Sequence, residues 1–393
     1  MTERRVLISG AGIAGTSLAY WLARCGYRPT VVERAPDLRT GGSPVDVRGQ
    51  SLEVAERMGV LDEIRAAHTD IRNLSIVDEK GVVGARVPMT AFGAAGDIET
   101  MRGDLVRILY RASERDTEYV FGDTITALDQ DADGVTASFA HAVPRRFELV
   151  LGADGLHSAV RGLVFGAQEN YLHHLGCMVG VATVAREFGR DREVLLYNVP
   201  GKAVGVYRSG NHDHARVIFL SREPAPRYDH RDQAAQRELL AENFTGLGWR
   251  TPELLGAMRG SAEFFFDTVS QVRMPEWSCG RIGVLGDAAY CPALLSGTGS
   301  GLAMVGAYVL AGELAATGDP VRALRGYEQV LRAQVRRGQS RVGYGGGVLV
   351  PASRTGLRTR NLAARFLAPL AKPGSSRKRS APLPEYPIPQ RIA

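Results

Sequence analysis

RRVLISGAGIAGTSLAYWLARCGYRPTVVER, residues 4–34, is the stretch that decides the fold of this chain. Its apolar run Val6–Ile8 indicates a buried strand. A GxGxxG motif follows at once, with glycines at Gly10, Gly12 and Gly15, and a helix pattern begins there. A second strand then ends at Glu33. Glycine-rich turns of unrelated α/β proteins can carry the same three glycines, but here strand, helix, second strand and acid stand in the order that a dinucleotide-binding unit requires.

The residues of this motif have separate physical roles. The first glycine permits a tight turn, the second lets a pyrophosphate approach the backbone, and the third lets helix and strand pack closely. The helix N-terminus presents unpaired N–H groups and a positive dipole end to the phosphates, and an acid after the second strand can accept hydrogen bonds from ribose hydroxyls. The sequence therefore predicts a dinucleotide site at Gly10, Gly12, Ala14, Gly15, Glu33 and Arg34.

A second strand-then-turn pattern lies between Leu149 and Arg161. The strand delivers Asp154 and Gly155 at its C-terminal end, and a helix starts near Ser158. Ligands of open α/β sheets bind at such strand ends, which makes Asp154 a candidate binding residue. A simple turn, with Asp and Ser capping the helix, is the alternative.

A third pattern of this kind comes late in the chain. A strand from Arg281 leads to Gly286-Asp287, and a helix later opens with the run Gly297, Thr298, Gly299, Ser300 and Gly301. Backbone N–H groups at such a helix N-terminus form an anion or dipole site. The two helix N-termini, one near each end of the chain, can therefore face a single ligand.

Residues 171–275 differ in character, because several runs there read as strands of an antiparallel sheet. We interpret this region as a lobe that faces the substrate. Candidate wall residues of a cavity are Tyr207, Phe219, Phe264, Phe266 and, outside the lobe, Leu294. Strand alternation places Phe264 and Phe266 on one face but does not say which face points inward, and burial in the core is an equal alternative for each aromatic residue. His212 and His214 have a spacing used by some metal sites, but they lie in a turn, so we expect a hairpin tip and no metal.

Composition excludes several classes of protein. The chain has 393 residues and 45% hydrophobic content, typical of a soluble globular protein. The longest nearly uncharged stretch, Leu294–Gly312, is interrupted by glycines, so we expect no membrane span.

The net charge of +6 comes from the end of the chain, because nine Lys and Arg and one acid follow from Arg354 onward. No nucleic-acid motif accompanies these basic residues, so we expect no nucleic-acid partner. Four cysteines without metal spacing favour reduced thiols in the cytoplasm: Cys25, Cys177, Cys279 and Cys291.

Together, the GxGxxG motif with Glu33, the Asp154-Gly155 motif and Gly286-Asp287 resemble the class A flavin-dependent aromatic hydroxylases typified by p-hydroxybenzoate hydroxylase, and within them the shorter, tetracycline-monooxygenase-like branch. The resemblance spans roughly residues 6–314 and implies FAD as cofactor. By this likeness, Asp287 would bind a ribityl or ribose hydroxyl of FAD, and Arg48 and Arg102 would contact the cofactor. The backbone of residues 298–301 would lie against the pyrimidine edge of the flavin.

Three positions depart from the pattern of that family. Tyr290 stands where the family usually has His, and Leu294 stands where a proline usually lies beside the flavin. The family's GQGxN becomes the run 297–301, which loses the Gln and Asn side chains. Backbone contacts survive these changes, so we still expect FAD binding.

The resemblance also predicts the architecture. We expect an α/β protein with a Rossmann-like FAD-binding domain, an inserted antiparallel β-sheet substrate domain and C-terminal helices. The FAD-binding domain would be discontinuous, from 1–170 and 276–340, with the substrate-binding domain at 171–275. A helical segment at 341–371 and a disordered basic tail at 372–393 would follow.

The activity implied by the resemblance is that of a monooxygenase. NAD(P)H would reduce FAD, O₂ would react to give a C4a-hydroperoxyflavin, and an aromatic or polyketide-like small molecule would be hydroxylated or otherwise oxygenated by a monomer or homodimer. Because the cofactor carries the chemistry, no catalytic acid or base is assigned. Two alternatives stay open: a flavin-dependent reductase or dehydrogenase without oxygen insertion, and a catalytically degenerate FAD-containing binding protein. Metal-dependent and serine-hydrolase routes are not expected, because neither HExxH nor GxSxG occurs.

Overall fold

The structure is a computed structural model that describes residues 4–39, 41–92, 96–224, 228–340, 347–367 and 382–388. Its first sheet has six strands in the order β17-β18-β11-β1-β2-β7, and every pair is parallel except β17 with β18. The bounds of the strands are β1 Arg5–Ser9, β2 Arg28–Glu33, β7 Glu118–Phe121, β11 Leu149–Gly152, β17 Ser278–Cys279 and β18 Ile282–Val284. Four of the five residues of β1 are buried, as expected for a strand covered on both faces.

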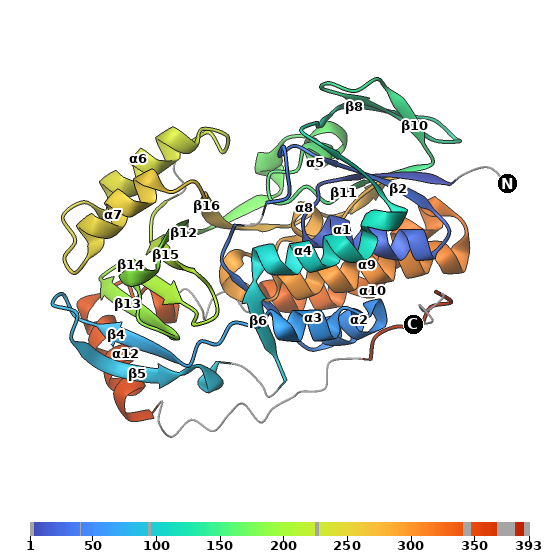
Figure 1. The fold of residues 1–393 in the computed structure, drawn as a ribbon. Coiled ribbons are helices and arrows are strands. Elements are labelled where there is room, and N and C mark those ends of the chain that lie inside the picture. The colour runs from blue at the N-terminus through green and yellow to red at the C-terminus, as the bar shows by residue number, and fades with distance from the viewer. Residues whose placement is uncertain are drawn as a thin grey trace.

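Helices from both ends of the chain cover this sheet. Figure 1 shows α1 and α4 beside α9 and α10, and α5 beside a small sheet of β8, β9 and β10. The bounds of these elements are α1 Ile13–Arg24, α4 Arg102–Ser113, α5 Ala159–Phe165, α9 Gly299–Thr317, α10 Pro320–Ser340, β8 Ile125–Gln130, β9 Val135–Phe139 and β10 Arg145–Phe147. Shorter helices are α2 Gln50–Met58, α3 Leu61–Ala66, α8 Asp287–Tyr290, and the single turns Met89–Ala91, Glu114–Asp116, Gln168–Asn170, Arg186–Phe188 and Leu294–Ser296. Among the described residues, α9 alone is long and apolar enough to cross a membrane, and it packs against α1 and α10 in the core.

The second sheet has seven strands in the order β16-β12-β15-β14-β13-β4-β5, all antiparallel except β13 with β4. Its strands are β4 Asn73–Val77, β5 Val83–Pro88, β12 Leu172–Ala185, β13 Glu193–Val199, β14 Lys202–Arg208, β15 His214–Ser221 and β16 Phe264–Val272. Helices α6 (Gln233–Phe244) and α7 (Thr251–Gly260) cover one face (Figure 1). A two-stranded ribbon of β3 (Pro44–Val47) and β6 (Ile98–Met101) completes the strands.

The predicted fold class is confirmed, but one predicted boundary is wrong. Strands β4 and β5 lie within residues 1–170, which the sequence assigned to the dinucleotide-binding domain, yet they pair with the second sheet through β13. The sequence of residues 74–83 has the pattern of a hairpin with Gly81 in its turn, but the strand with which this hairpin pairs, β13, is more than a hundred residues away. A sequence pattern shows that a strand exists and not which sheet it joins.

The tail also differs from the expectation of disorder. Residues 382–388 lie against the body of the protein, where Leu383 is buried and the Tyr386 hydroxyl donates to Glu313 Oε1 at 2.7 Å. The Tyr386 ring lies directly over Gly312 of α9, leaving no room for a side chain there. Residues 372–381 and 389–393 of the predicted tail, and residues 341–346 and 368–371 of the predicted helical segment, lie outside the described residues. Helix α12 (Arg354–Leu367) lies within the predicted helical segment.

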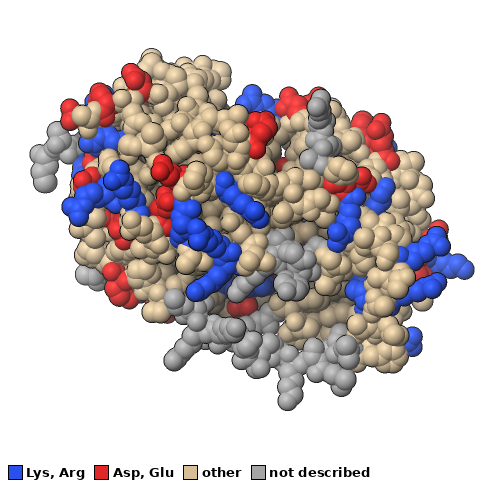
Figure 2. Space-filling model, turned by 180° about the vertical axis from the view of Figure 1, so that it is seen from behind, with Lys and Arg blue, Asp and Glu red and all other residues tan. Residues whose placement is uncertain are grey.

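Figure 2 shows the charged side chains of the described residues on one face of the protein. Lys and Arg side chains form several groups there, separated by uncharged surface and by acidic side chains. The Lys and Arg side chains that Figure 2 colours on this face therefore form no single continuous patch.

Candidate flavin site

The glycine loop between β1 and α1 has the geometry of a dinucleotide cradle. A β-carbon on Gly15 would overlap the carbonyl oxygen of Gly10, and one on Gly10 would lie 2.7 Å from the carbonyl oxygen of Ala153. Close packing therefore requires glycine at both positions. At Gly12, the N-cap of α1, the nearest atom to such a carbon would be Arg102 Nη2 at 3.8 Å, so this position is open to an approaching group. The loop thus fits a phosphate at Gly12, backed by the N–H groups of α1.

Glu33 ends β2 and supports this loop directly. Its buried carboxylate accepts hydrogen bonds from the backbone N–H groups of Ala11 and Ala35, each at 2.9 Å. Each carboxylate oxygen can accept a further bond, so a ribose hydroxyl is still accommodated. Ala14 lies in the first turn of α1 and packs beside Gly286, whereas Arg34 is exposed at the end of the strand.

Asp154 has the contacts of a helix cap. Its carboxylate accepts from the Ser158 hydroxyl at 2.5 Å and the Ser9 hydroxyl at 3.3 Å. It also accepts from the backbone N–H groups of Ala159 (2.8 Å) and Val160 (3.2 Å) at the start of α5. Four protein donors already use this carboxylate, so the capping alternative accounts for Asp154.

The next functional position of this motif is Arg161, to which the sequence assigned no role. Its side chain is fully buried, and burial lowers its pKa. Nη1 donates to the carbonyl oxygen of Ala288 at 2.8 Å and Nη2 to that of Leu156 at 2.6 Å. Arg161 therefore joins the Asp154 turn to α8, the helix that carries Asp287. The sequence showed only an arginine shortly after the Asp154-Gly155 turn, and neither its burial nor its contact with Ala288 could be predicted from it.

Asp287 and Arg102 flank the glycine loop with opposite charges. Burial raises the pKa of the Asp287 carboxyl. Its side chain is nevertheless accessible to solvent. A carboxylate in a recess of the protein surface accounts for both observations. Burial also lowers the pKa of Arg102, which begins α4 and lies against Gly12 and Gly42. The cation is thus next to the expected pyrophosphate, and the carboxylate is available to accept hydroxyl hydrogen bonds.

The loop of residues 297–301 closes the cleft from the other side. A β-carbon on Gly299, the first residue of α9, would lie 3.8 Å from Asp287 Oδ1, and one on Gly301 would lie 3.3 Å from Ser51 Oγ. Within the loop the Thr298 N–H donates to Ser296 Oγ at 3.2 Å, and Ser300 is half-buried. The two predicted helix N-termini, α1 and α9, therefore meet at Asp287.

Asp46 is a site residue that the sequence prediction missed. A β-carbon on Gly297 would lie 3.2 Å from Asp46 Oδ2, so this acid lies directly beside the flavin loop. Burial raises its pKa to about 6, opposed by Arg48, whose Nη2 lies 2.5 Å from Asp46 Oδ1. Arg48 Nε also lies 3.5 Å from Asp97 Oδ2. Arg48, which was predicted to contact the cofactor, thus forms ion pairs with two acids, Asp46 and Asp97. The only signal in the sequence was the spacing of Asp46 and Arg48, because residues two apart in an extended segment share one face.

Three of the predicted wall residues point away from this cleft. Phe219 is fully buried with its ring 5.1 Å from Phe244 of α6. Phe266 is 5% exposed, and the Phe264 ring has the Arg237 guanidinium of α6 at 4.4 Å. The prediction that Phe219, Phe264 and Phe266 line the cavity is therefore wrong, because these residues form the core under α6 and α7.

The opposite face of the sheet meets the flavin loop. Val181 and Leu220 pack there with Ala293 and Leu295, immediately before Gly297. Tyr207 is on this face and donates its hydroxyl to Glu99. Phe265, which stands between the two core phenylalanines in the sequence, is on the same face of the sheet as Tyr207 and is 42% exposed. Leu294 is 45% exposed. Tyr207 and Leu294 thus remain candidates, and Phe265 joins them.

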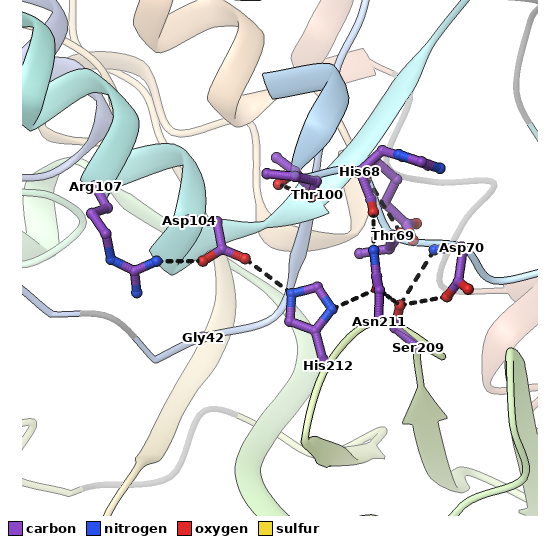
Figure 3. A network of polar contacts seen from close by, with 12 residues as sticks. Gly42, His68, Thr69, Asp70, Thr100, Asp104, Arg107, Ser209, Asn211 and His212 are labelled. Carbon is purple, nitrogen blue, oxygen red and sulfur yellow. Dashed lines mark hydrogen bonds and ion pairs between the residues drawn. The ribbon is translucent and has the colours of Figure 1, made fainter. Parts of the chain in front are cut away.

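A polar network fixes the second sheet to the cofactor side (Figure 3). His212, at the tip of the β14–β15 hairpin, has Nε2 3.0 Å from Asp104 Oδ2, and Asp104 pairs with Arg107 at 2.7 Å. Asn211 and Ser209 continue the contact to residues 68–70. The hydrogen bond from His212 is the main cause that holds the pKa of Asp104 below its usual value. His212 is thus a hairpin-tip residue, and the described residues contain no cluster of three or more metal-ligating side chains.

Comparison with known proteins agrees with this geometry. A family model described as an FAD binding domain matches residues 3–333. The chain belongs to this FAD binding domain family, and its fold and site define a flavoprotein. Within that class it is an FAD-dependent monooxygenase, because it is 38% identical over 338 residues to a flavin-dependent monooxygenase of Legionella longbeachae, covering 85% of this chain and 87% of that protein.

Two further similarities extend this result. An uncharacterised protein of Mycobacterium tuberculosis is 43% identical over 320 residues, covering 80% of this chain and 86% of that protein. The crystal structure of the tetracycline destructase Tet(51) superposes with a TM-score of 0.85 at 31% identity, covering 98% of this chain and all of that one. The likeness therefore includes the second sheet as well as the FAD-binding fold.

Proposed function

We propose that this enzyme takes electrons from NAD(P)H, consumes O₂ and inserts one oxygen atom into a flat, partly aromatic small molecule of the polyketide or phenol type. The observation that carries the proposal is where the loop 297–301 lies. Gly299 is beside Asp287, and Ala293 and Leu295, just before the loop, pack on one apolar face of the seven-stranded sheet. The names of the relatives support oxygenation, and the tetracycline destructase supports a large ring system as substrate.

The cofactor-binding residues follow from the geometry of the cleft. We assign the pyrophosphate of FAD to the backbone at Gly10–Gly15, where the α1 N-terminus and the Arg102 guanidinium supply positive charge. Asp287 would accept a hydrogen bond from a ribityl or ribose hydroxyl, and Glu33 would accept one from the adenosine ribose. When bound, FAD supplies the redox and oxygen-activating chemistry that no side chain can supply.

The N-terminus of α9 would serve the flavin ring. Its unpaired N–H groups at residues 299–301 carry partial positive charge and would stabilise negative charge on the pyrimidine edge. Asp46 lies beside the same loop and has a pKa near 6, so its charge state in this environment changes close to neutral pH. We assign it the role of holding a proton near that edge, with Arg48 as its partner.

The substrate would lie between the flavin loop and the second sheet. Phe265 and Leu294 offer exposed apolar surface suited to a flat ring, and they would exclude water from the reacting atoms. The Tyr207 hydroxyl is committed to Glu99, so we assign Tyr207 to shaping this wall.

Product mass separates this proposal from its alternatives. The purified protein, reconstituted with FAD, is incubated with NADH or NADPH and a panel of phenols and aromatic polyketides in air. Gain of one oxygen atom by a substrate supports oxygenation. Gain or loss of two hydrogen atoms without oxygen indicates a reductase or dehydrogenase, and ligand binding without turnover indicates a binding protein; either result contradicts the proposal.

A further inference from the structure

A cavity of about 360 Å³ lies outside the flavin cleft, between the end of β16, helix α8 and the last turns of α10. Buried Trp277 and Tyr290 form its aromatic wall, with ring centroids 4.6 Å apart. The Tyr290 hydroxyl is held by that of Tyr327 at 3.0 Å. Gln339 of α10 donates to the carbonyl oxygen of Val272 at 2.7 Å and joins the two sides of the cavity. The wall is therefore preformed.

Three arginines line the same cavity: Arg273, Arg332 and Arg336. Arg332 lies over the Trp277 ring, 5.1 Å from its centroid, and its charge is compensated by Glu328. Arg273 donates to a neutral acceptor, Gln271 Oε1, at 2.8 and 3.0 Å. Within the described part of the chain, neither Arg273 nor Arg336 forms an ion pair with a carboxylate, and no acid is among the residues that line the cavity.

We propose that this cavity is a second binding site, for a small aromatic anion such as an aromatic carboxylate. A planar ring fits against Trp277 and Tyr290, where stacking adds to apolar burial. The carboxylate is then within the reach of Arg273 and Arg336, whose guanidinium groups bind carboxylates through paired hydrogen bonds. The volume of the cavity is within the range of small-molecule sites, roughly 300–1,000 Å³.

This second site is separate from the flavin cleft, although one short helix borders both. Asp287 at the start of α8 faces Gly299 and the glycine loop, whereas Ala289 and Tyr290 line the cavity. Helix α8 therefore lies between the two sites.

The test uses the FAD-loaded enzyme and 1-naphthoate as probe, with equilibrium dialysis for affinity and flavin absorbance for occupancy of the cleft. We expect one naphthoate per chain without a change in the flavin spectrum. Arg273→Gln together with Arg336→Gln should weaken binding by about tenfold or more, because two charged hydrogen-bond donors are lost. Both side chains are exposed, so folding should be retained.

Arg325→Gln with Arg337→Gln is the matched control, since these exposed residues of α10 carry the same charge but do not line the cavity. The control variant should bind 1-naphthoate as the parent does, and the neutral 1-naphthamide should bind weakly and equally to all three proteins. Equal naphthoate affinity of the two double variants would overturn the proposal. So would naphthoate binding that changes the flavin spectrum and is indifferent to Arg273 and Arg336.

Discussion

Phe264, Phe265 and Phe266 illustrate what a single residue contributes to this site. Neighbouring residues of a strand point to opposite faces, so the outer two rings enter the core under α6 and α7 while the central ring is directed to the flavin side. Period-two alternation predicts this separation but not its direction. The direction depends on which face the helices cover, and that is a property of the whole sheet.

Substitution of adjacent phenylalanines should have opposite effects. Phe265→Ala should raise peroxide formation uncoupled from product, because water gains access to the flavin, while the free energy of unfolding changes by about 0.5 kcal/mol or less. Phe266→Ala should cost about 3–5 kcal/mol of stability and leave coupling near the parent value in the protein that folds. The measurements are chemical denaturation and the ratio of NAD(P)H oxidised to product formed. Normal coupling in Phe265→Ala would place the substrate elsewhere.

Asp287 should determine how tightly FAD is retained. Asp287→Ala removes an acceptor for a buried hydroxyl and should weaken FAD binding by about 1–3 kcal/mol. Asp287→Asn keeps a carbonyl acceptor and should lose less. Titration of the apoprotein with FAD, followed by flavin fluorescence, measures both constants, and an unchanged constant in Asp287→Ala would remove this residue from the site.

At the scale of elements, the βαβ unit was predictable and the partnership of strands was not. The glycine spacing in residues 4–34 specified strand, helix and strand, because packing at Gly10 and Gly15 excludes a side chain. The Asp154 motif was visible too, but residue type alone could not separate a ligand from a helix cap. Asp46 and Arg161 were missed because their importance comes from contacts with Gly297 and Ala288, far away in the chain.

The β14–β15 hairpin should make stability depend on acidity through Asp104. Its pKa is lowered in the folded state, so its contribution is present above the unfolded value of about 4 and is lost as the pH falls below it. The melting temperature of Asp104→Asn should therefore fall less than that of the parent between pH 6 and pH 3. The reason is that the parent's Asp104 carboxylate takes up a proton as the pH falls through this interval, whereas the amide side chain of the variant cannot. Asp62→Asn, at an exposed position of α3, is the control and should behave as the parent does. An equal fall in the melting temperatures of the parent and Asp104→Asn over this pH range would contradict this role.

At the scale of the whole molecule, distant segments join to make one cleft. In the function we propose, the first sheet supplies the cofactor side, the second sheet supplies the substrate side, and the start of α9 contributes to both. The two sheets and α9 can be followed in Figure 1. The segment 382–388 then crosses α9, where Glu385 pairs with Arg57 and Tyr386 covers Gly312. The segment 382–388 is therefore part of the folded body.

Removal of residues 382–393 should destabilise the enzyme without preventing FAD binding. Loss of the Leu383 and Tyr386 contacts should lower the free energy of unfolding by about 1–3 kcal/mol. A chain that ends at Ile388 keeps these contacts and should have the melting temperature of the parent. If the shorter truncation and the longer one melt alike, the segment contributes no stability.

Oxygen transfer is the central claim, and isotope incorporation tests it most directly. The FAD-loaded enzyme is supplied with NAD(P)H and an aromatic substrate under isotopically heavy O₂ in ordinary water, and the product mass is measured. A monooxygenase incorporates one heavy oxygen atom from the gas into each product molecule. A product that gains or loses only hydrogen, or whose new oxygen comes from water, would contradict the account.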